Sequence, residues 1–230
     1  MVTVAVWTVG GLFLDRHVDL TGQVLLGTLT CGVLAAVLWI HEPAVRLQAL
    51  AVVAIASCGE VIGSLIWGVY RYRLDNLPVF VPPGHGLVYL AGMSIATLAA
   101  GRRLTWLLLG VAAAGAAAWG IAGMTVLPAL DVSGAIGCTF LLAVLAVTRR
   151  PVYAGVFLVV AGLEIYGTAL GTWTWQASVP GLGLPQGNPP SGAASGYVVF
   201  DVLALALSTQ VVRVARVLPF AEWRRLAFSR

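Results

Sequence analysis

The sequence is a succession of apolar runs, each about 20 residues long, separated by short polar segments. A run of this length crosses the hydrocarbon core of a bilayer as one helix. Backbone groups in lipid must be hydrogen-bonded within the protein, which leaves helices or closed barrels, and these runs are too long and continuous for barrel strands. Only 10% of the residues are charged, against about 25% in soluble domains. The sequence therefore predicts an all-α membrane protein with a single membrane domain, residues 1–230.

Polar breaks between the runs predict a bundle of seven transmembrane helices. Pro43 ends the first run, because proline disfavours helix in the residue before it. The expected spans are 20–40, 44–70, 84–100, 104–124, 130–147, 152–176 and 194–218. Residues 2–14 are apolar but short, and we expect a short N-terminal helix there that lies at the membrane interface or inserts only partly. We find no internal repeat and no soluble domain.

The basic residues, all thirteen of them arginines, are distributed unevenly between the loops. The expected spans place ten on one side of the membrane and three, Arg16, Arg71 and Arg73, on the other. Cytoplasmic loops carry the excess of positive charge. We therefore predict a multi-pass protein of the cell (plasma) membrane with a cytoplasmic C-terminus. Nucleic-acid binding is a poor explanation of the net charge of +4, since the arginines sit at helix ends without interleaved aromatic residues.

Ionisable side chains inside the spans are the first candidates for function, because placing one in a membrane costs a few kcal/mol. Five such groups fall in the outer half of the expected bundle: Glu60, His85, Asp131, Glu164 and Asp201. Glu60 and Asp201 are the strongest catalytic candidates, since apolar residues flank each of them for at least a turn on both sides.

Aromatic side chains share this outer layer. Tyr89 follows His85 by four residues and Tyr197 precedes Asp201 by four, so each pair lies on one helix face. The loop 187–192 leads into the last helix and can cover a cavity. We expect a substrate pocket in which the two carboxyls are joined by Trp67, His85, Tyr89, Trp119, Glu164, Tyr166, Trp173, Asn188 and Tyr197.

Several of these residues have a second explanation that the sequence leaves open. Tryptophan and tyrosine gather at membrane interfaces, which accounts equally well for Tyr72, Trp173 and Trp175. Asp131 suits a helix N-cap, His85 can be solvated at the start of its helix, and Glu164 can hydrogen-bond between helices.

The residue types favour acid chemistry without a metal or a cofactor. The chain has three histidines, which gives little support to a di-metal or haem site, and it lacks a nucleophile elbow and a phosphate-binding loop. A carboxylic acid buried in an apolar site keeps its proton near neutral pH and can protonate an alkene or epoxide. Aromatic faces stabilise the resulting carbocation, and a dry pocket keeps water from quenching it.

The layout resembles the small membrane-integral terpene cyclases of meroterpenoid and indole-terpenoid pathways. Those proteins have a similar length, seven predicted spans, a glutamate in the second span and an aspartate in the last. The matching positions are Glu60 in Cys58-Gly59-Glu60-Val61 and Asp201 in Tyr197-Val-Val-Phe-Asp201, with Gly59 where fungal members carry tryptophan. The resemblance implies metal-free, proton-initiated cyclisation of a farnesyl- or geranylgeranyl-bearing aromatic or indole substrate, with Glu60 or Asp201 as the proton donor.

Two other functions compete with the cyclase. A proton-coupled carrier of small molecules also uses carboxyls inside the membrane, although we find neither an inverted repeat nor paired broken helices. An accessory subunit of a membrane complex would need no closed cavity and would tolerate Glu60→Gln. The expected partners are the lipid bilayer and a lipophilic prenylated small molecule, and no nucleic acid.

Overall fold

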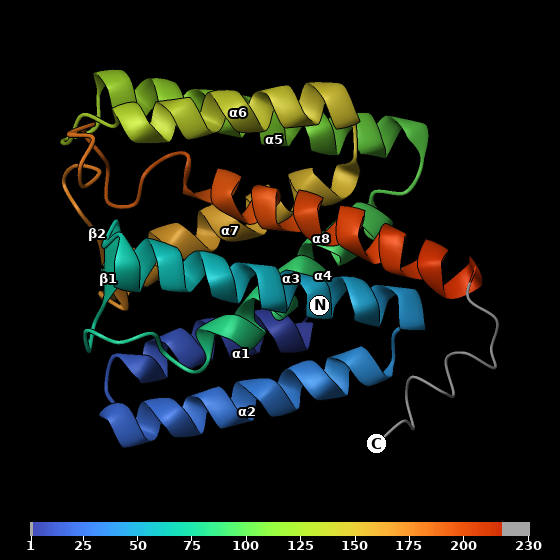
Figure 1. The fold of residues 1–230 in the computed structure, drawn as a ribbon. Coiled ribbons are helices and arrows are strands. Elements are labelled where there is room, and N and C mark those ends of the chain that lie inside the picture. Colours follow the sequence, from blue (N-terminus) through green and yellow to red (C-terminus); the bar gives the residue numbers. More distant parts are fainter. Residues whose placement is uncertain (1, 218–230) are drawn as a thin grey trace.

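The computed structural model of the chain describes residues 2–217 and is almost entirely helical (Figure 1). Helix α3 continues into a π-helical segment, η1. The helices are α1 (Val2–Asp15), α2 (Leu20–Trp39), α3 (Pro43–Glu60), η1 (Val61–Ile66), α4 (Val81–Leu98), α5 (Arg102–Thr125), α6 (Val132–Thr148), α7 (Pro151–Leu170) and α8 (Ala193–Val217). Two short strands, β1 (Tyr70–Tyr72) and β2 (Trp173–Trp175), pair antiparallel at one end of the bundle (Figure 1).

Five helical segments are long and apolar enough to cross a membrane: Leu20–Trp39, Pro43–Ile66, Arg102–Thr125, Pro151–Leu170 and Ala193–Gln210. Helices α1 and α6 are apolar but shorter. A helix stands at each of the seven expected positions, and α1 is the expected N-terminal helix. Length and composition therefore support a multi-pass membrane protein, whereas the number of crossings and their orientation stay predictions.

Two expected helix ends were placed too late in the sequence. The helix expected to reach residue 70 stops at Ile66, and Gly68 turns the chain with a φ of 72°. The helix expected to reach residue 176 stops at Leu170, and Gly171 turns the chain with a φ of 74°. Each glycine is followed by a strand of aromatic residues. Aromatic strands continue the apolar signal of a span, so hydropathy alone does not detect the break.

The two ends of the bundle differ in their chemistry. The strands and the long loop before α8 lie together, and we call this the strand end (Figure 1). The connections α2–α3, α4–α5 and α6–α7 lie at the opposite end (Figure 1), which we call the arginine end because Arg46, Arg102, Arg103, Arg149 and Arg150 lie in or beside them. The predicted arginine asymmetry therefore corresponds to two physical ends of the bundle.

The described chain consists of two corresponding halves, so the expectation of no internal repeat was wrong. Residues 2–98 and 102–217 each contain three helices, a strand and a fourth helix in the same order. The contacts between the halves also correspond, because α3 packs on α8 while α7 packs on α4. Helices α3 and α7 both run toward the strand end (Figure 1), so the two halves have the same direction and are not inverted.

Short sequence motifs at equivalent positions support this correspondence. Asp19 caps α2 by accepting a hydrogen bond from Gly22 N at 2.9 Å, and Asp131 caps α6 by accepting one from Gly134 N at 3.0 Å. The motif Leu-Pro-x-x-x-Pro-Pro occurs at 77–83 and again at 184–190. The motifs are separated by different numbers of apolar residues, which hides the repeat from inspection of the sequence.

Helices α4 and α7 cross closely at the centre of the bundle. Gly92 of α4 and Gly155 of α7 meet there, and a Cβ atom on either residue would overlap the backbone of the other helix. Their close approach places the first turns of α4 near the last turns of α7, since the helices are antiparallel. This arrangement brings ionisable side chains from both halves to the strand end.

Candidate functional site

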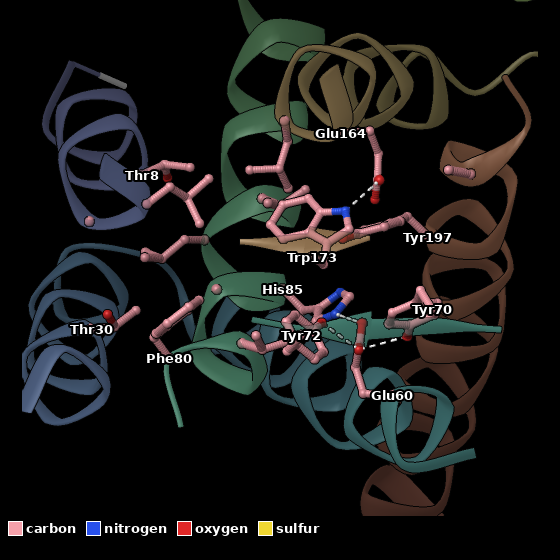
Figure 2. A pocket seen from close by; sticks show the side chains of 18 of the residues that line it. Thr8, Thr30, Glu60, Tyr70, Tyr72, Phe80, His85, Glu164, Trp173 and Tyr197 are labelled. Carbon is pink, nitrogen blue, oxygen red and sulfur yellow. Dashed lines mark hydrogen bonds and ion pairs between the residues drawn. The ribbon is translucent and has the colours of Figure 1, made fainter. Parts of the chain in front are cut away.

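A cavity of about 140 Å³ lies among the helices near the strand end. Both halves contribute to its walls, which are mainly apolar and aromatic. Its lining includes Trp7, Leu12, Thr30, Glu60, Tyr70, Tyr72, Phe80, His85, Glu164, Trp173, Trp175, Tyr197 and Phe200. Figure 2 shows side chains from α1, α2, α4 and α8 converging on this space, with Glu60 and Glu164 at different parts of the wall. The cavity is therefore a candidate site with two carboxyl groups.

Glu60, the last residue of α3, is only 4% exposed, and both of its carboxyl oxygens have hydrogen-bonding partners. The hydroxyls of Tyr70 and Tyr72 each donate to Oε2 at 2.7 Å, and His85 Nε2 lies 2.8 Å from Oε1 (Figure 2). Burial, followed by the charge of Glu60, raises the pKa of Tyr72 well above its usual range, and the same causes raise that of Tyr70. Both tyrosines therefore remain neutral donors to the carboxylate.

Glu164, near the end of α7, is 2% exposed and has a different set of partners. The indole N–H groups of Trp173 and Trp175 both donate to one oxygen, Oε2, at 2.9 and 3.0 Å. Neither indole donates to Oε1. The two carboxyls thus face one cavity with unequal hydrogen-bonding arrangements.

The strand pair explains how four aromatic donors reach two carboxyls. Side chains alternate along a strand, so Tyr70 and Tyr72 project to one side of β1, as Trp173 and Trp175 do on β2. The register pairs Tyr70 with Trp175 and Tyr72 with Trp173. The strands therefore hold the donors at the strand end, next to the last turns of α3 and α7.

The two carboxyl-bearing segments, 60–72 and 164–175, align with one insertion and share the glutamate and two glycines. Glutamate is followed after three residues by glycine, then by a hydroxyl residue that donates to the carbonyl oxygen of the glutamate at 2.7 Å, Ser64 in one segment and Thr168 in the other. The first aromatic donor stands ten residues after Glu60 and nine after Glu164. The extra residue is accommodated by η1, since a π-helical turn holds one residue more than an α-helical turn.

Glycines make room for the aromatic rings around these carboxyls. A side chain on Gly167 would overlap the indole of Trp173, and one on Gly63 would crowd the ring of Tyr70. The ring of Phe200 from α8 occupies the space beside Gly59 in the same way. A side chain at position 59 would therefore overlap this ring.

Helix α1 covers the cavity from the side of the first half. Trp7 Nε1 donates to Thr30 Oγ1 at 3.1 Å, which ties α1 to α2. The hydroxyl of Tyr166 donates to the carbonyl oxygen of Val9 at 3.2 Å, which ties α1 to α7. The short N-terminal helix is therefore part of the site.

The structure brings together five of the eleven predicted site residues. Those that line the cavity are Glu60, His85, Glu164, Trp173 and Tyr197. The ring of Tyr197 stacks on that of His85 with centroids 4.7 Å apart. The other six, Trp67, Tyr89, Trp119, Tyr166, Asn188 and Asp201, are not among the lining residues.

Three of these six help to position the cavity walls. Tyr166 holds α1, as described above. Trp67 Nε1 donates to the carbonyl oxygen of Pro180 at 2.9 Å, and Asn188 Oδ1 accepts from Trp175 N at 3.0 Å. These contacts attach the loop before α8 to the rest of the strand end. Trp119 is partly exposed on α5.

Asp201 and Tyr89 lie one helical turn beyond the cavity, toward the arginine end. Asp201 follows Tyr197 by one turn of α8, is 2% exposed, and its Oδ2 has no hydrogen-bond partner. Tyr89 follows His85 by one turn of α4 and donates to Gln48 Oε1 at 2.9 Å. Helical spacing predicted the shared faces but not this difference in depth.

Asp131 is a structural residue, as its N-cap interpretation predicted. Besides capping α6, it accepts hydrogen bonds from Gly187 N at 2.9 Å and from Ser191 N and Oγ at 2.6 and 2.7 Å. It thus fastens the loop that leads into α8.

Sequence reasoning missed Tyr70 and the α1 residue Trp7, and it left Tyr72 and Trp175 undecided between the pocket and the membrane interface. Their signal was the pattern of glycine, one residue, then aromatic-x-aromatic, which occurs once in each half. Within residues 2–217, His, Cys, Asp and Glu form no group of three that could hold a metal ion. Comparison of the chain with known protein families, curated proteins and solved structures finds no match.

Proposed function

We propose that the protein is a membrane-bound terpene cyclase, which protonates a prenyl chain on a lipophilic aromatic or indole substrate and closes a ring through a carbocation. The observation that carries this proposal is the pair of buried carboxyls, Glu60 and Glu164, in one aromatic-lined cavity. Their unequal hydrogen bonding suits two different roles in acid–base chemistry.

Glu164 is the proposed proton donor. Both indoles donate to Oε2, so a proton on Oε1 conflicts with neither hydrogen bond. In a protonated carboxylic acid the other oxygen is a carbonyl acceptor, which is what two N–H donors require. An alkene carbon of the substrate takes the proton from Oε1, and its π electrons form the new C–H bond.

Glu60 is the proposed counter-charge and final base. Two tyrosine hydroxyls donate to Oε2, and His85 donates to Oε1 when its Nε2 carries a proton, an arrangement that the ionised form satisfies fully. A second alkene or the aromatic ring attacks the carbocation to form the C–C bond. Loss of a proton to Glu60, next to His85, restores the double bond or the aromatic ring. The product is an isomer of the substrate, and transfer of that proton back to Glu164 resets the site.

The rest of the lining fits a cationic intermediate. Aromatic faces attract a desolvated cation by about 2 kcal/mol or more, and Trp7, Tyr197 and Phe200 are among those that line the cavity. Apolar walls also reduce the access of water, which would quench the cation.

The size of the cavity limits what reacts there. At about 140 Å³ it is comparable to an engineered protein cavity of about 150 Å³ that holds benzene. One ring or the end of one prenyl chain fits this space. We therefore propose formation of a single ring at the chain end, with the remaining part of the substrate outside the cavity.

Glu164→Gln and Glu60→Gln test the proposal. Membranes containing each variant are supplied with farnesyl- or geranylgeranyl-bearing indoles and phenols, and products of unchanged mass are sought by chromatography. We expect the wild type to form an isomer and both variants to lose it. Glu42→Gln is the matched control, because Glu42 is exposed at the arginine end. Full product formation by both cavity variants would rule out the proposal.

A proton-coupled carrier is the second candidate, favoured by the same lining. A cage of aromatic faces and carboxylates also suits a lipophilic ammonium ion. Uptake of a labelled organic cation into proteoliposomes, driven by a pH gradient and lost in Glu60→Gln, would support the carrier. Isomer formation without such uptake would support the cyclase.

A further inference from the structure

A second hollow, which we call the α2–α3 groove, lies beside the cavity and has a volume of about 580 Å³. Apart from one thiol, its walls carry only apolar side chains. They are formed by Cys31, Leu34, Ala35, Leu38, Leu50, Val53, Leu77, Pro78, Val79, Pro82 and Pro83. Helices α2 and α3 are both long and apolar enough to span a membrane, so the groove opens toward a hydrocarbon environment.

The groove exists because the two halves differ at one helix. In the second half, α5 has 24 residues and packs on both α6 and α7. Its counterpart α1 has 14 residues and packs on α2, α4 and α7. In the second half α5 lies against α7. The equivalent place against α3 in the first half is occupied by the groove, because α1 covers the cavity instead.

The floor of the groove is formed where three helices converge. Leu34 from α2 and Val53 from α3 both approach Gly86 of α4, where a Cβ atom would meet their methyl groups. Hydrogen-bonding side chains do not line the groove. Its chemistry therefore selects a hydrocarbon chain.

The groove and the cavity border the same face of α2. Leu26, Thr30, Leu34 and Leu38 follow at intervals of four residues and are all buried. Leu26 and Thr30 line the cavity, whereas Leu34 and Leu38 line the groove. Successive turns of this face therefore border first the cavity and then the groove, and Thr30 and Leu38 are about 12 Å apart along the helix.

We propose that the α2–α3 groove binds the prenyl chain of the substrate whose end reacts in the cavity. This inference rests on the proposed function, because the cavity has room for only one ring. The groove has about four times the volume of a cavity that holds benzene, so several isoprene units fit. A farnesyl or geranylgeranyl chain would lie along α2 with its reactive end at Glu164 and Glu60.

Photo-crosslinking tests this assignment without requiring turnover. The probe is a geranylgeranyl indole with a diazirine in its prenyl chain, and the competitor is unlabelled geranylgeranyl indole or palmitate. We expect labelling of Leu34, Leu38, Leu50 and Val53 that geranylgeranyl indole abolishes and palmitate does not. Equal competition by palmitate would assign the groove to lipid acyl chains and overturn the proposal.

Ala35 and Ala36 provide a matched pair of variants. Ala35 lines the groove, and its neighbour Ala36 is exposed and lines neither hollow. Ala35→Phe should lower labelling about tenfold, the effect of excluding two methylene groups from an apolar site, and Ala36→Phe should leave it unchanged. Cys31→Phe fills the same wall in case Ala35→Phe does not fold. Unchanged labelling in both groove variants would contradict the proposal.

Glu164→Gln separates this inference from the proposed function. Wild-type labelling in a Glu164→Gln protein that forms no isomer supports both. Specific labelling together with full isomer formation by the Glu164→Gln and Glu60→Gln variants would leave the groove in place and remove the proposed chemistry.

Discussion

The two carboxyl-bearing segments share one scaffold but surround their glutamates differently. Both place a glutamate three residues before a glycine, turn at a second glycine and return two aromatic donors on a strand. Glu60 has donors on both oxygens, including His85, whereas Glu164 receives two indole N–H groups on one oxygen. The same local scaffold, present in both halves, thus holds two carboxyls with unequal hydrogen bonding in one cavity.

His85 is the main source of this difference. In the Leu-Pro-x-x-x-Pro-Pro motif of the first half, His85 stands two residues after the last proline. The same position in the second half is Gly192, whose lack of a side chain lets it pack against Gly134 and Gly137 of α6. At this position the first half therefore places an imidazole beside its carboxyl, whereas in the second half the glycine allows close contact with α6.

Apart from the two glutamates, replacing His85 should have the largest effect. We expect His85→Phe to lower isomer formation about 10²-fold or more, since it removes the partner of the final base. Product is measured in membranes with His41→Gln, at the arginine end, as the control. Wild-type activity in His85→Phe would show that the imidazole is not needed and that the two segments are chemically equivalent.

Amide substitutions should affect stability unequally. Glutamine resembles a protonated glutamate, so Glu164→Gln keeps one oxygen for both indoles and should cost less than about 1 kcal/mol. In Glu60→Gln an amide N–H₂ replaces one accepting oxygen, and we expect a loss of about 1–3 kcal/mol. Unfolding of both variants in detergent measures the difference. The reverse order would contradict the assigned protonation states.

The donors of the two segments should also respond differently to alkaline pH. Tyr70 and Tyr72 have raised pKa values in the folded protein, whereas tyrosines in the unfolded chain ionise near pH 10. The folded state therefore holds more protons, and stability falls as pH rises above about 10. Tyr72→Phe should reduce this slope by about one proton, and Trp175→Phe should not change it. Thermal unfolding between neutral pH and pH 11 tests this, and equal slopes in all three proteins would contradict it.

Asp201→Asn should have the smallest effect on activity. Asp201 lies one turn beyond the cavity, and its Oδ2 has no hydrogen-bond partner among the described residues. We therefore expect isomer formation to stay within about tenfold of the wild type, less than a general acid contributes. Loss of product comparable to that of Glu164→Gln would instead support the catalytic role that the resemblance to terpene cyclases implies.

The fold was largely predictable from the sequence, because a membrane-spanning helix is a long run of apolar residues and hydropathy detects such runs. The ends of α3 and α7 were not predictable, because hydropathy does not separate the aromatic residues of the two strands from those of a membrane span. These residues are Tyr70, Tyr72, Trp173 and Trp175. Glu60, His85 and Glu164 were predicted to meet because the arginine asymmetry fixed their shared layer. Asp201 was predicted at the same level, but the crossing of the helices leaves it one turn too deep. Helix α1 does not pack beside α3 as α5 packs beside α7, and this difference leaves room for the groove. A single sequence carries no signal of it.

Infrared spectroscopy of the carboxyl groups tests the central claim most directly, since protonated and ionised carboxyls absorb at different frequencies. The measurement is made at neutral pH in an Asp201→Asn background, which removes a buried carboxyl whose Oδ2 has no hydrogen-bond partner among the described residues. The account predicts a protonated carboxyl band that disappears with Glu164→Gln and persists with Glu60→Gln. A band that persists with Glu164→Gln and disappears with Glu60→Gln would contradict it.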